Sequence, residues 1–269
     1  MKKLLSILCA GLCVLTLTSC GGKKPGGESM EAKKKDLIVF AAASMTESLN
    51  QVKKMYEKEN PDVNVVLNLD SSGTLKTQIS EGADCDVFIS ASSKQMNELD
   101  KENEKFKSNV AIDSSTRFNL LENKVTLAVK EDSDKGIASF EDINTDKVKT
   151  IALGNADVPV GQYSEELLKK MGIWDAIQGK ISFASNVKEV TGWVSEGAVD
   201  CGIIYSTDAK AAGLKIVDTA DSSMFKKKVI YPAAVVETAK NKDQAKKFLD
   251  FLKSDPAKKV FDSFGFKTL

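Results

Sequence analysis

The stretch LIVFAAASMTESL, residues 37–49, joins an apolar run to a segment with helical spacing through three alanines and Ser44. The apolar run 37–40 is typical of a buried strand, and the apolar residues that follow recur at helical spacing, at Leu49, Val52, Met55 and Tyr56. Glu47 stands three residues after Ser44, which is the spacing of a helix capping box. The stretch therefore predicts a strand that passes directly into a helix through small residues.

Strand and helix signals alternate along the rest of the chain. A first set is expected to contain strands 37–42, 63–69 and 86–90, with helices 46–59, about 74–81, and one that begins near 93. A second set is expected to contain strands 124–129, 149–153, 180–183 and 201–205, with helices 162–171 and 187–195. The chain then continues through strand 233–236 and helices 241–253 and 255–263. This alternation is typical of α/β folds with parallel sheets.

The two sets predict two lobes, between which the chain crosses near 118–123 and near 228–233. We expect the first lobe in residues 36–119, the second in 120–228, and a return to the first in 229–269. The predicted fold is α/β, with mixed and mainly parallel sheets and a two-strand hinge. A cleft between such lobes can open and close, although two rigidly packed lobes would give a similar pattern.

The first twenty residues have the features of an export signal. Lys2 and Lys3 precede an almost wholly apolar stretch, 4–17, which is short for a membrane span. The following Leu17-Thr18-Ser19-Cys20 resembles the processing box of bacterial lipoproteins, and an ordinary signal peptide that ends near a cysteine is the alternative. We expect a signal peptide at 1–19, a lipid on Cys20 and a flexible tether over 20–35.

Composition excludes several classes of protein. The 269 residues carry no net formal charge, and removal of the signal peptide with its two lysines would change the net charge only to −2. Nucleic acid is therefore not an expected partner. The chain has no histidine, which excludes a Ser-His-Asp triad and any histidine-ligated metal site. We expect no cofactor and no direct protein–metal ligands.

Two cysteines, Cys85 and Cys201, lie beyond the predicted export signal. An exported protein could pair them in a disulfide. Each one, however, stands beside an aspartate at the start of an apolar strand, and the two strands are expected in different sheets. We therefore expect two free, partly buried thiols.

Small and hydroxyl-bearing residues mark the predicted strand ends in both lobes. Ser44 and the segment Asp70-Ser71-Ser72-Gly73-Thr74 follow strands of the first set, Pro159-Val160-Gly161 and Asn186-Val187 open helices of the second, and Tyr205 ends a strand. A helix N-terminus presents unpaired N–H groups and partial positive charge, so it can hold an anion without lysine or arginine. The alternatives are structural: Ser44 as a helix cap, the Ser72 segment as a turn, and Tyr205 as a core tyrosine.

Six motifs run in order through residues 36–269: VFAAASMTESL, SSGTLKTQI, DVFISAS, DVPVGQY, GIIYSTDA and VIYPAAVV. Together they resemble the molybdate-binding proteins of bacterial molybdate ABC transporters, a family with the type II periplasmic-binding-protein fold. The resemblance implies that neutral donors hold molybdate or tungstate. These donors would be hydroxyl and N–H groups of Ser44 and Ser72, N–H groups of Val160 and Val187, and the hydroxyl of Tyr205.

The resemblance also implies partners and a location. The protein would be an extracytoplasmic monomer, anchored to the cell membrane by its lipid, that passes the anion to a membrane permease driven by an ATPase. Val160 replaces the alanine common in the family, a change that a backbone donor tolerates, and Cys201 is also atypical before the GIIY strand.

Two other classes of function stay open at this point. An enzyme could use Ser44 or Ser185 as nucleophile, since Ser185 and Lys188 match the Ser-x-x-Lys pattern of acyl-enzymes. A surface lipoprotein could instead bind another protein, which would require an exposed apolar patch. We favour the binding protein and expect no enzymatic activity.

Overall fold

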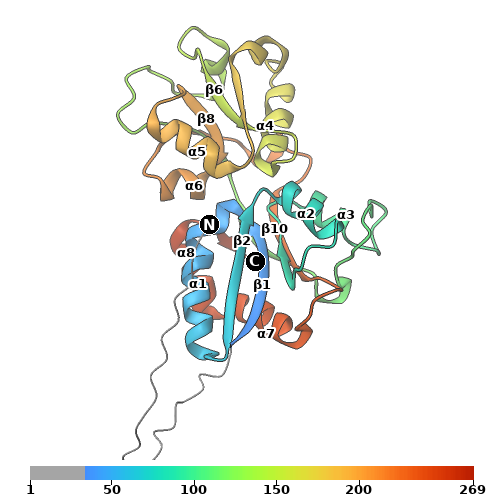
Figure 1. Cartoon of the computed structure of the whole chain (residues 1–269). Coiled ribbons are helices and arrows are strands. Elements are labelled where there is room, and N and C mark those ends of the chain that lie inside the picture. The colour runs from blue at the N-terminus through green and yellow to red at the C-terminus, as the bar shows by residue number, and fades with distance from the viewer. Residues whose placement is uncertain (1–33) are drawn as a thin grey trace, which may run out of the picture. The chain divides into compact units, whose positions relative to one another are not determined.

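Two mixed sheets organise the computed structural model, which describes residues 34–269 (Figure 1). The first has the strand order β11-β4-β10-β3-β1-β2, and the second has the order β7-β6-β8-β5-β9. In the first sheet β1 (Lys35–Ala42) runs parallel to β2 (Val63–Asp70) and β3 (Val87–Ile89). The antiparallel strands of this sheet are β4 (Phe118–Asn123), β10 (Val229–Val235) and β11 (Lys267–Thr268).

The second sheet follows the same plan. Its parallel strands are β6 (Ile151–Gly154), β7 (Ile181–Ala184) and β8 (Cys201–Tyr205). Antiparallel pairing adds β5 (Val125–Val129) and β9 (Lys215–Thr219). The prediction of two mixed α/β sheets is confirmed. The sheets contain more antiparallel pairing than expected, because strands β4, β5, β9 and β10, which flank the two crossings, all make antiparallel pairs.

Helices cover the sheets. Those of the first sheet are α1 (Thr46–Glu59), α2 (Ser72–Ser80), α3 (Ser93–Glu98), α7 (Lys242–Leu252) and α8 (Asp255–Phe264). Those of the second are α4 (Pro159–Lys170), α5 (Val187–Glu196) and α6 (Ser206–Ala211). Short 3-10 turns η1 to η5 occupy Ala43–Met45, Ser114–Thr116, Phe140–Asn144, Asp175–Lys180 and Ser222–Met224.

Alternation along β1 explains how the first sheet is covered on both faces. Leu37, Val39 and Ala41 belong to the core cluster that also holds the apolar stripe of α1, whereas Phe40 belongs to a cluster with Leu75 of α2. Successive side chains of a strand point to opposite faces, so one apolar run serves two helical layers. Figure 1 shows α1, α7 and α8 on one side of this sheet and α2 and α3 on the other.

The chain passes between the sheets at two places. Lys124 alone separates β4 in the first sheet from β5 in the second, and residues 220–228 lead back from β9 to β10. The boundary expected at 119/120 falls inside β4, whose residues Leu121–Asn123 still pair with β10 or β11. Strands β4, β9 and β11 and helix α6 were not among the expected elements.

Both thiols of the described chain are free, as predicted, and they lie in different sheets. Cys85 precedes β3 and is 4% exposed, and Cys201 begins β8 with no exposed surface. They are thus buried more completely than expected. Burial raises the pKa of Cys201 to about 12 and also raises the pKa of Cys85, so both remain thiols at neutral pH.

The predicted signal peptide, Cys20 and most of the tether lie outside the described residues. Within residues 34–269, no helix combines the length and the apolar character that crossing a membrane requires.

Candidate functional site between the two sheets

A small cavity lies where strand ends of the two sheets face each other. The space between its atoms, open solvent included, is about 200 Å³, and the lining residues are Ala42, Ala43, Ser44, Asp70, Ser71, Ser72, Ala91, Val158, Pro159, Val160, Val187 and Tyr205. The first seven end or follow β1, β2 and β3 of the first sheet, and the others come from the starts of α4 and α5 and from the end of β8. All five donors expected from the sequence therefore line one cavity.

The Ser44 side chain does not cap a helix. The chain makes a 3-10 turn over Ala43–Met45 before α1 begins, and neither start has a side-chain cap. Ser44 Oγ instead lies 2.8 Å from the hydroxyl of Tyr231, and Glu47 accepts hydrogen bonds from Lys188. The capping-box interpretation is therefore wrong, and Ser44 is available to the cavity that it lines.

The adjacent residues Ser71 and Ser72 have different roles: Ser71 caps a helix, and Ser72 presents its hydroxyl to the cavity. Ser71 caps α2 by accepting a hydrogen bond from the Thr74 N–H. Ser72, with no exposed surface, accepts a hydrogen bond from the Ala91 N–H at 2.9 Å. Because an N–H can only donate, the Ser72 hydroxyl keeps its own hydrogen for an acceptor in the cavity.

The second lobe contributes two helix N-termini. Val160 is the second residue of α4, after a proline that has no N–H, and Val187 is the first residue of α5. N–H groups of a first helical turn have no acceptor within their helix. A Cβ on Gly161 would stand 2.2 Å from the Gly154 carbonyl oxygen, so this glycine lets the first turn of α4 pack directly against the end of β6.

Tyr205 brings a buried hydroxyl that has no hydrogen-bond partner among the described residues. The residue is 1% exposed, and its ring packs edge-on against that of Tyr231 with centroids 5.9 Å apart. Burial raises the pKa of Tyr205 well above its usual value, so the group stays a neutral donor. An unpaired buried hydroxyl costs about 1–3 kcal/mol unless a water or a ligand supplies the acceptor.

The cavity has no basic lining residue within residues 34–269, and its charged group is the carboxylate of Asp70. Asp70 Oδ1 accepts a hydrogen bond from the Ser71 N–H at 2.7 Å and lies 3.4 Å from Asn186 Nδ2 across the cleft. Any anion held here is therefore bound by neutral groups. The sequence analysis did not identify Asp70 as part of the site.

A cluster of three charged side chains, of which only Asp208 is fully buried, joins the lobes beside the cavity. Lys188 of α5 lies 2.7 Å from Glu47 of α1 and 3.0 Å from Asp208 of α6. The Asp208 side chain has no exposed surface, and burial raises its pKa to about 6 despite the neighbouring ammonium. These two carboxylates raise the pKa of Lys188, so its charge is compensated before any ligand binds.

The lobes also meet backbone to backbone. A Cβ added to Gly73 of α2 would stand 2.2 Å from the carbonyl oxygen of Asp157, which precedes α4 in the other lobe. Ser71 Oγ lies 3.4 Å from the same carbonyl oxygen. Glycine at 73 is therefore what allows this close approach.

The residues proposed for an acyl-enzyme do not form one. Ser185 is exposed and its hydroxyl donates to Glu189 at 2.9 Å, while Lys188 is held by two carboxylates. Ser44 has a tyrosine hydroxyl, not a base, as its hydrogen-bond partner. Among residues 34–269, no lysine is hydrogen-bonded to either serine.

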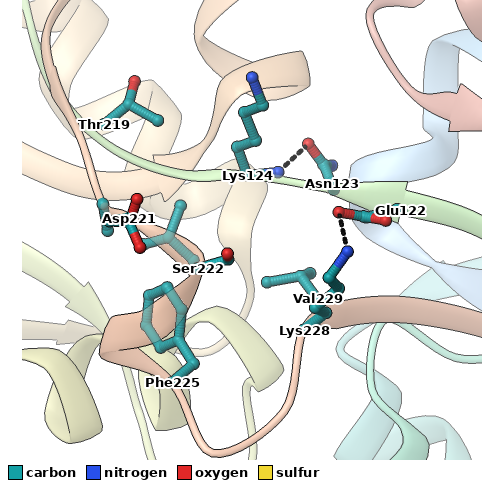
Figure 2. A pocket seen from close by; sticks show the side chains of 11 residues that line it. Glu122, Asn123, Lys124, Thr219, Asp221, Ser222, Phe225, Lys228 and Val229 are labelled. Carbon is teal, nitrogen blue, oxygen red and sulfur yellow. Dashed lines mark hydrogen bonds and ion pairs between the residues drawn. The ribbon is translucent and has the colours of Figure 1, made fainter.

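A second and larger cavity lies beside the crossings and is shown in Figure 2. It encloses about 780 Å³ and opens between residues 122–125 and 219–229. Glu122 and Lys228 pair across it, and Lys124 donates its N–H to Asn123 Oδ1. Two helix N-termini and the unpaired buried hydroxyl of Tyr205 meet at the smaller cavity between the sheets, which is therefore the candidate binding site.

Two α/β lobes joined by two crossings, with inward-facing donors where they meet, define a two-lobed solute-binding protein. Residues 37–267 match the model of the bacterial extracellular solute-binding protein family, and the chain belongs to this family. The type II fold expected from the sequence is confirmed.

Named relatives cover nearly the whole chain. A molybdate-binding protein of Haemophilus influenzae, ModA, is 39% identical over 237 residues, which are 86% of this chain and 89% of that protein. YvgL of Bacillus subtilis, provisionally named an ABC transporter substrate-binding lipoprotein, is 35% identical and aligned over 99% of each chain. The solved substrate-binding domain of a provisionally assigned molybdenum ABC transporter from Clostridium difficile is 37% identical, with a TM-score of 0.65, and covers 87% of this chain and 99% of that one.

The buried Asp208 predicts a specific dependence of stability on pH. Its folded-state pKa of about 6 lies above the ordinary aspartate value of 3.8, so the folded protein binds more protons than the unfolded chain between these values. The stabilising contribution of this group is thus complete below about pH 4 and is lost as pH rises through about 6. Relative to Asp208→Asn, the wild type should lose about 2 kcal/mol of unfolding free energy between pH 4.5 and pH 7. Urea unfolding of both proteins at the two pH values measures this change, and a difference independent of pH would contradict it.

Proposed function

We propose that this protein captures molybdate, or tungstate of the same shape, between its lobes and delivers it to an ABC permease. The observation that carries the proposal is the set of inward-facing neutral donors without acceptors, above all the orphaned hydroxyl of Tyr205. The names of the relatives from Haemophilus influenzae and Clostridium difficile support molybdenum as the element carried.

Neutral donors suit a fully deprotonated tetrahedral oxyanion. Such an ion has only acceptors, and an acceptor left unmet in a dry site costs several kcal/mol. Hydroxyl and N–H groups donate only along directions fixed by the fold, so they select by size and bond direction rather than by charge.

Capture would involve both lobes. Ser44 and Ser72 belong to the first and Val160, Val187 and Tyr205 to the second, so the anion is surrounded only when the lobes meet. Closure around the anion would present both lobes together to the permease, and its ATPase would drive release. In this role the protein acts as an extracytoplasmic monomer and not as an enzyme.

Ligand-dependent stability tests the proposed function. A ligand at a thousand times its dissociation constant adds about 4 kcal/mol to the unfolding free energy. We expect molybdate and tungstate, and not sulfate or phosphate, to raise the melting temperature of residues 34–269 by several degrees. Ser44→Ala and Ser72→Ala should each reduce the rise, whereas Ser48→Ala, a buried serine outside the cavity, should not.

Each other result of this experiment has a definite meaning. A rise with sulfate or phosphate alone would replace the proposed ligand by another oxyanion. No rise with any of the four ions would reject the oxyanion site.

The close approach at Gly73 predicts that closure is needed for tight binding. In Gly73→Ala the new methyl group would overlap the Asp157 carbonyl oxygen at the approach of the lobes that this structure shows, whereas lobes standing apart would leave room for it. An overlap of this kind costs about 1–3 kcal/mol, which is about a 5- to 150-fold loss of molybdate affinity. Calorimetric titration should show this loss while the ligand-free melting temperature stays unchanged. Gly179→Ala, where a methyl group meets nothing, is the matched control.

We further propose that residues 1–19 are a signal peptide and that Cys20 carries the lipid that anchors the protein to the cell membrane. The sequence Leu17-Thr18-Ser19-Cys20 and the likeness to a relative named a lipoprotein support this. Cys20→Ala should abolish incorporation of radiolabelled palmitate during expression in a bacterium. Equal labelling of the variant and the wild type would disprove lipidation at this cysteine.

A further inference from the structure

Asn123 lies at the crossing between the two sheets. It ends β4, directly before Lys124, the single residue that leads into the second sheet. It also lines the larger cavity beside the crossings that Figure 2 shows. Its side chain reaches groups of both lobes. Asn123 Nδ2 donates to Thr207 Oγ1 at 2.9 Å and to the Tyr231 hydroxyl at 3.2 Å.

The other end of this amide fixes its orientation. Asn123 Oδ1 accepts from the Lys124 N–H at 2.8 Å and from the Ser206 hydroxyl at 3.2 Å. A backbone N–H can only donate, so the oxygen of the amide must face Lys124 and the nitrogen must face Tyr231. All four hydrogen bonds that an asparagine side chain can form are made, and the amide cannot be reversed without losing them.

In this orientation Asn123 donates to the Tyr231 oxygen, which leaves the Tyr231 hydrogen free to be donated onward. Tyr231 is fully buried, and burial raises its pKa, so it keeps its single hydroxyl hydrogen. Its oxygen already accepts from Asn123, and Ser44 Oγ lies 2.8 Å away. The Tyr231 hydrogen can then be donated to Ser44, which leaves the hydrogen of Ser44 free.

We propose that Asn123 and Tyr231 are positioning residues that hold the Ser44 hydroxyl as a donor toward the anion. The inference rests on the proposed function, because it assigns a direction to one of the donors of that site. In the reverse arrangement Ser44 would donate to Tyr231 and would present only a lone pair to the anion, which would repel it. Ser72 reaches the same state through the Ala91 N–H, so both serines act as donors.

A double-mutant cycle on molybdate affinity, measured by calorimetric titration of residues 34–269, tests this proposal. Tyr231→Phe removes the group that donates to Ser44 and should weaken binding about fivefold, the equivalent of one ordinary hydrogen bond. In the Ser44→Ala background the same substitution should change affinity less than twofold, because Tyr231 acts through the Ser44 hydroxyl. A purely structural role would give the same fivefold loss in both backgrounds and would overturn the proposal.

Two further variants make the outcome unambiguous. Tyr56→Phe removes a buried tyrosine hydroxyl that binds Gln244 in α7, away from the cavity, and should leave the affinity unchanged. If Tyr231→Phe does not fold, as judged by its ligand-free urea transition, Asn123→Ala replaces it in the same cycle with the same expected coupling to Ser44. Failure of the wild type to bind molybdate would reject the proposed function and this role with it, whereas binding with additive effects would reject this role alone.

Discussion

Buried hydrogen-bond donors without protein acceptors are the constraint on which the rest of this structure depends. A donor removed from water must find an acceptor, or its desolvation penalty lowers stability. The orphaned Tyr205 hydroxyl and the free first turns of α4 and α5 meet at one cavity. These unpaired donors lower the stability of the ligand-free protein. A ligand rich in acceptors would satisfy them, so the same groups would contribute to its affinity.

The sheets and helices serve to aim these donors. Strands that end in small residues allow the following backbone to approach a ligand, and parallel strands place several such ends at the same edge. At Gly161 and Gly73 the neighbouring backbone lies so close that there is no room for a Cβ. Lys188 is held by Glu47 and Asp208 and does not line the cavity, so the charged group at the site is the carboxylate of Asp70.

The sequence predicts well what depends on local pattern. Helix α1 and strand β8 have the predicted bounds, because an Asn-Pro stop and a short apolar run mark them directly. The five expected donors also line one cavity, since each follows from a strand end or a helix start. Polar strand β4 was missed because its pairing with β10, more than a hundred residues away, decides its conformation.

Long-range contacts explain the remaining differences at the site. Ser44 followed by Glu47 has the local pattern of a helix cap. In the structure, however, Ser44 is hydrogen-bonded to Tyr231 and Glu47 to Lys188, and both partners are distant in sequence. Tyr231 lies within a motif that the sequence analysis identified, but nothing local shows that its hydroxyl points toward Ser44. A tyrosine inside an otherwise apolar strand was the available signal, the same one that drew attention to Tyr205.

The one-residue crossing at Lys124 bears on the thermodynamics of opening. Both neighbours of this residue belong to sheets, so few backbone torsions are free to change there when the lobes separate. Each backbone residue that is ordered costs about 1–2 kcal/mol in conformational entropy. If the lobes opened, almost no backbone residue at this crossing would become flexible, so the open form would gain little conformational entropy there. Closing the lobes around a ligand would then cost correspondingly little binding free energy at this crossing.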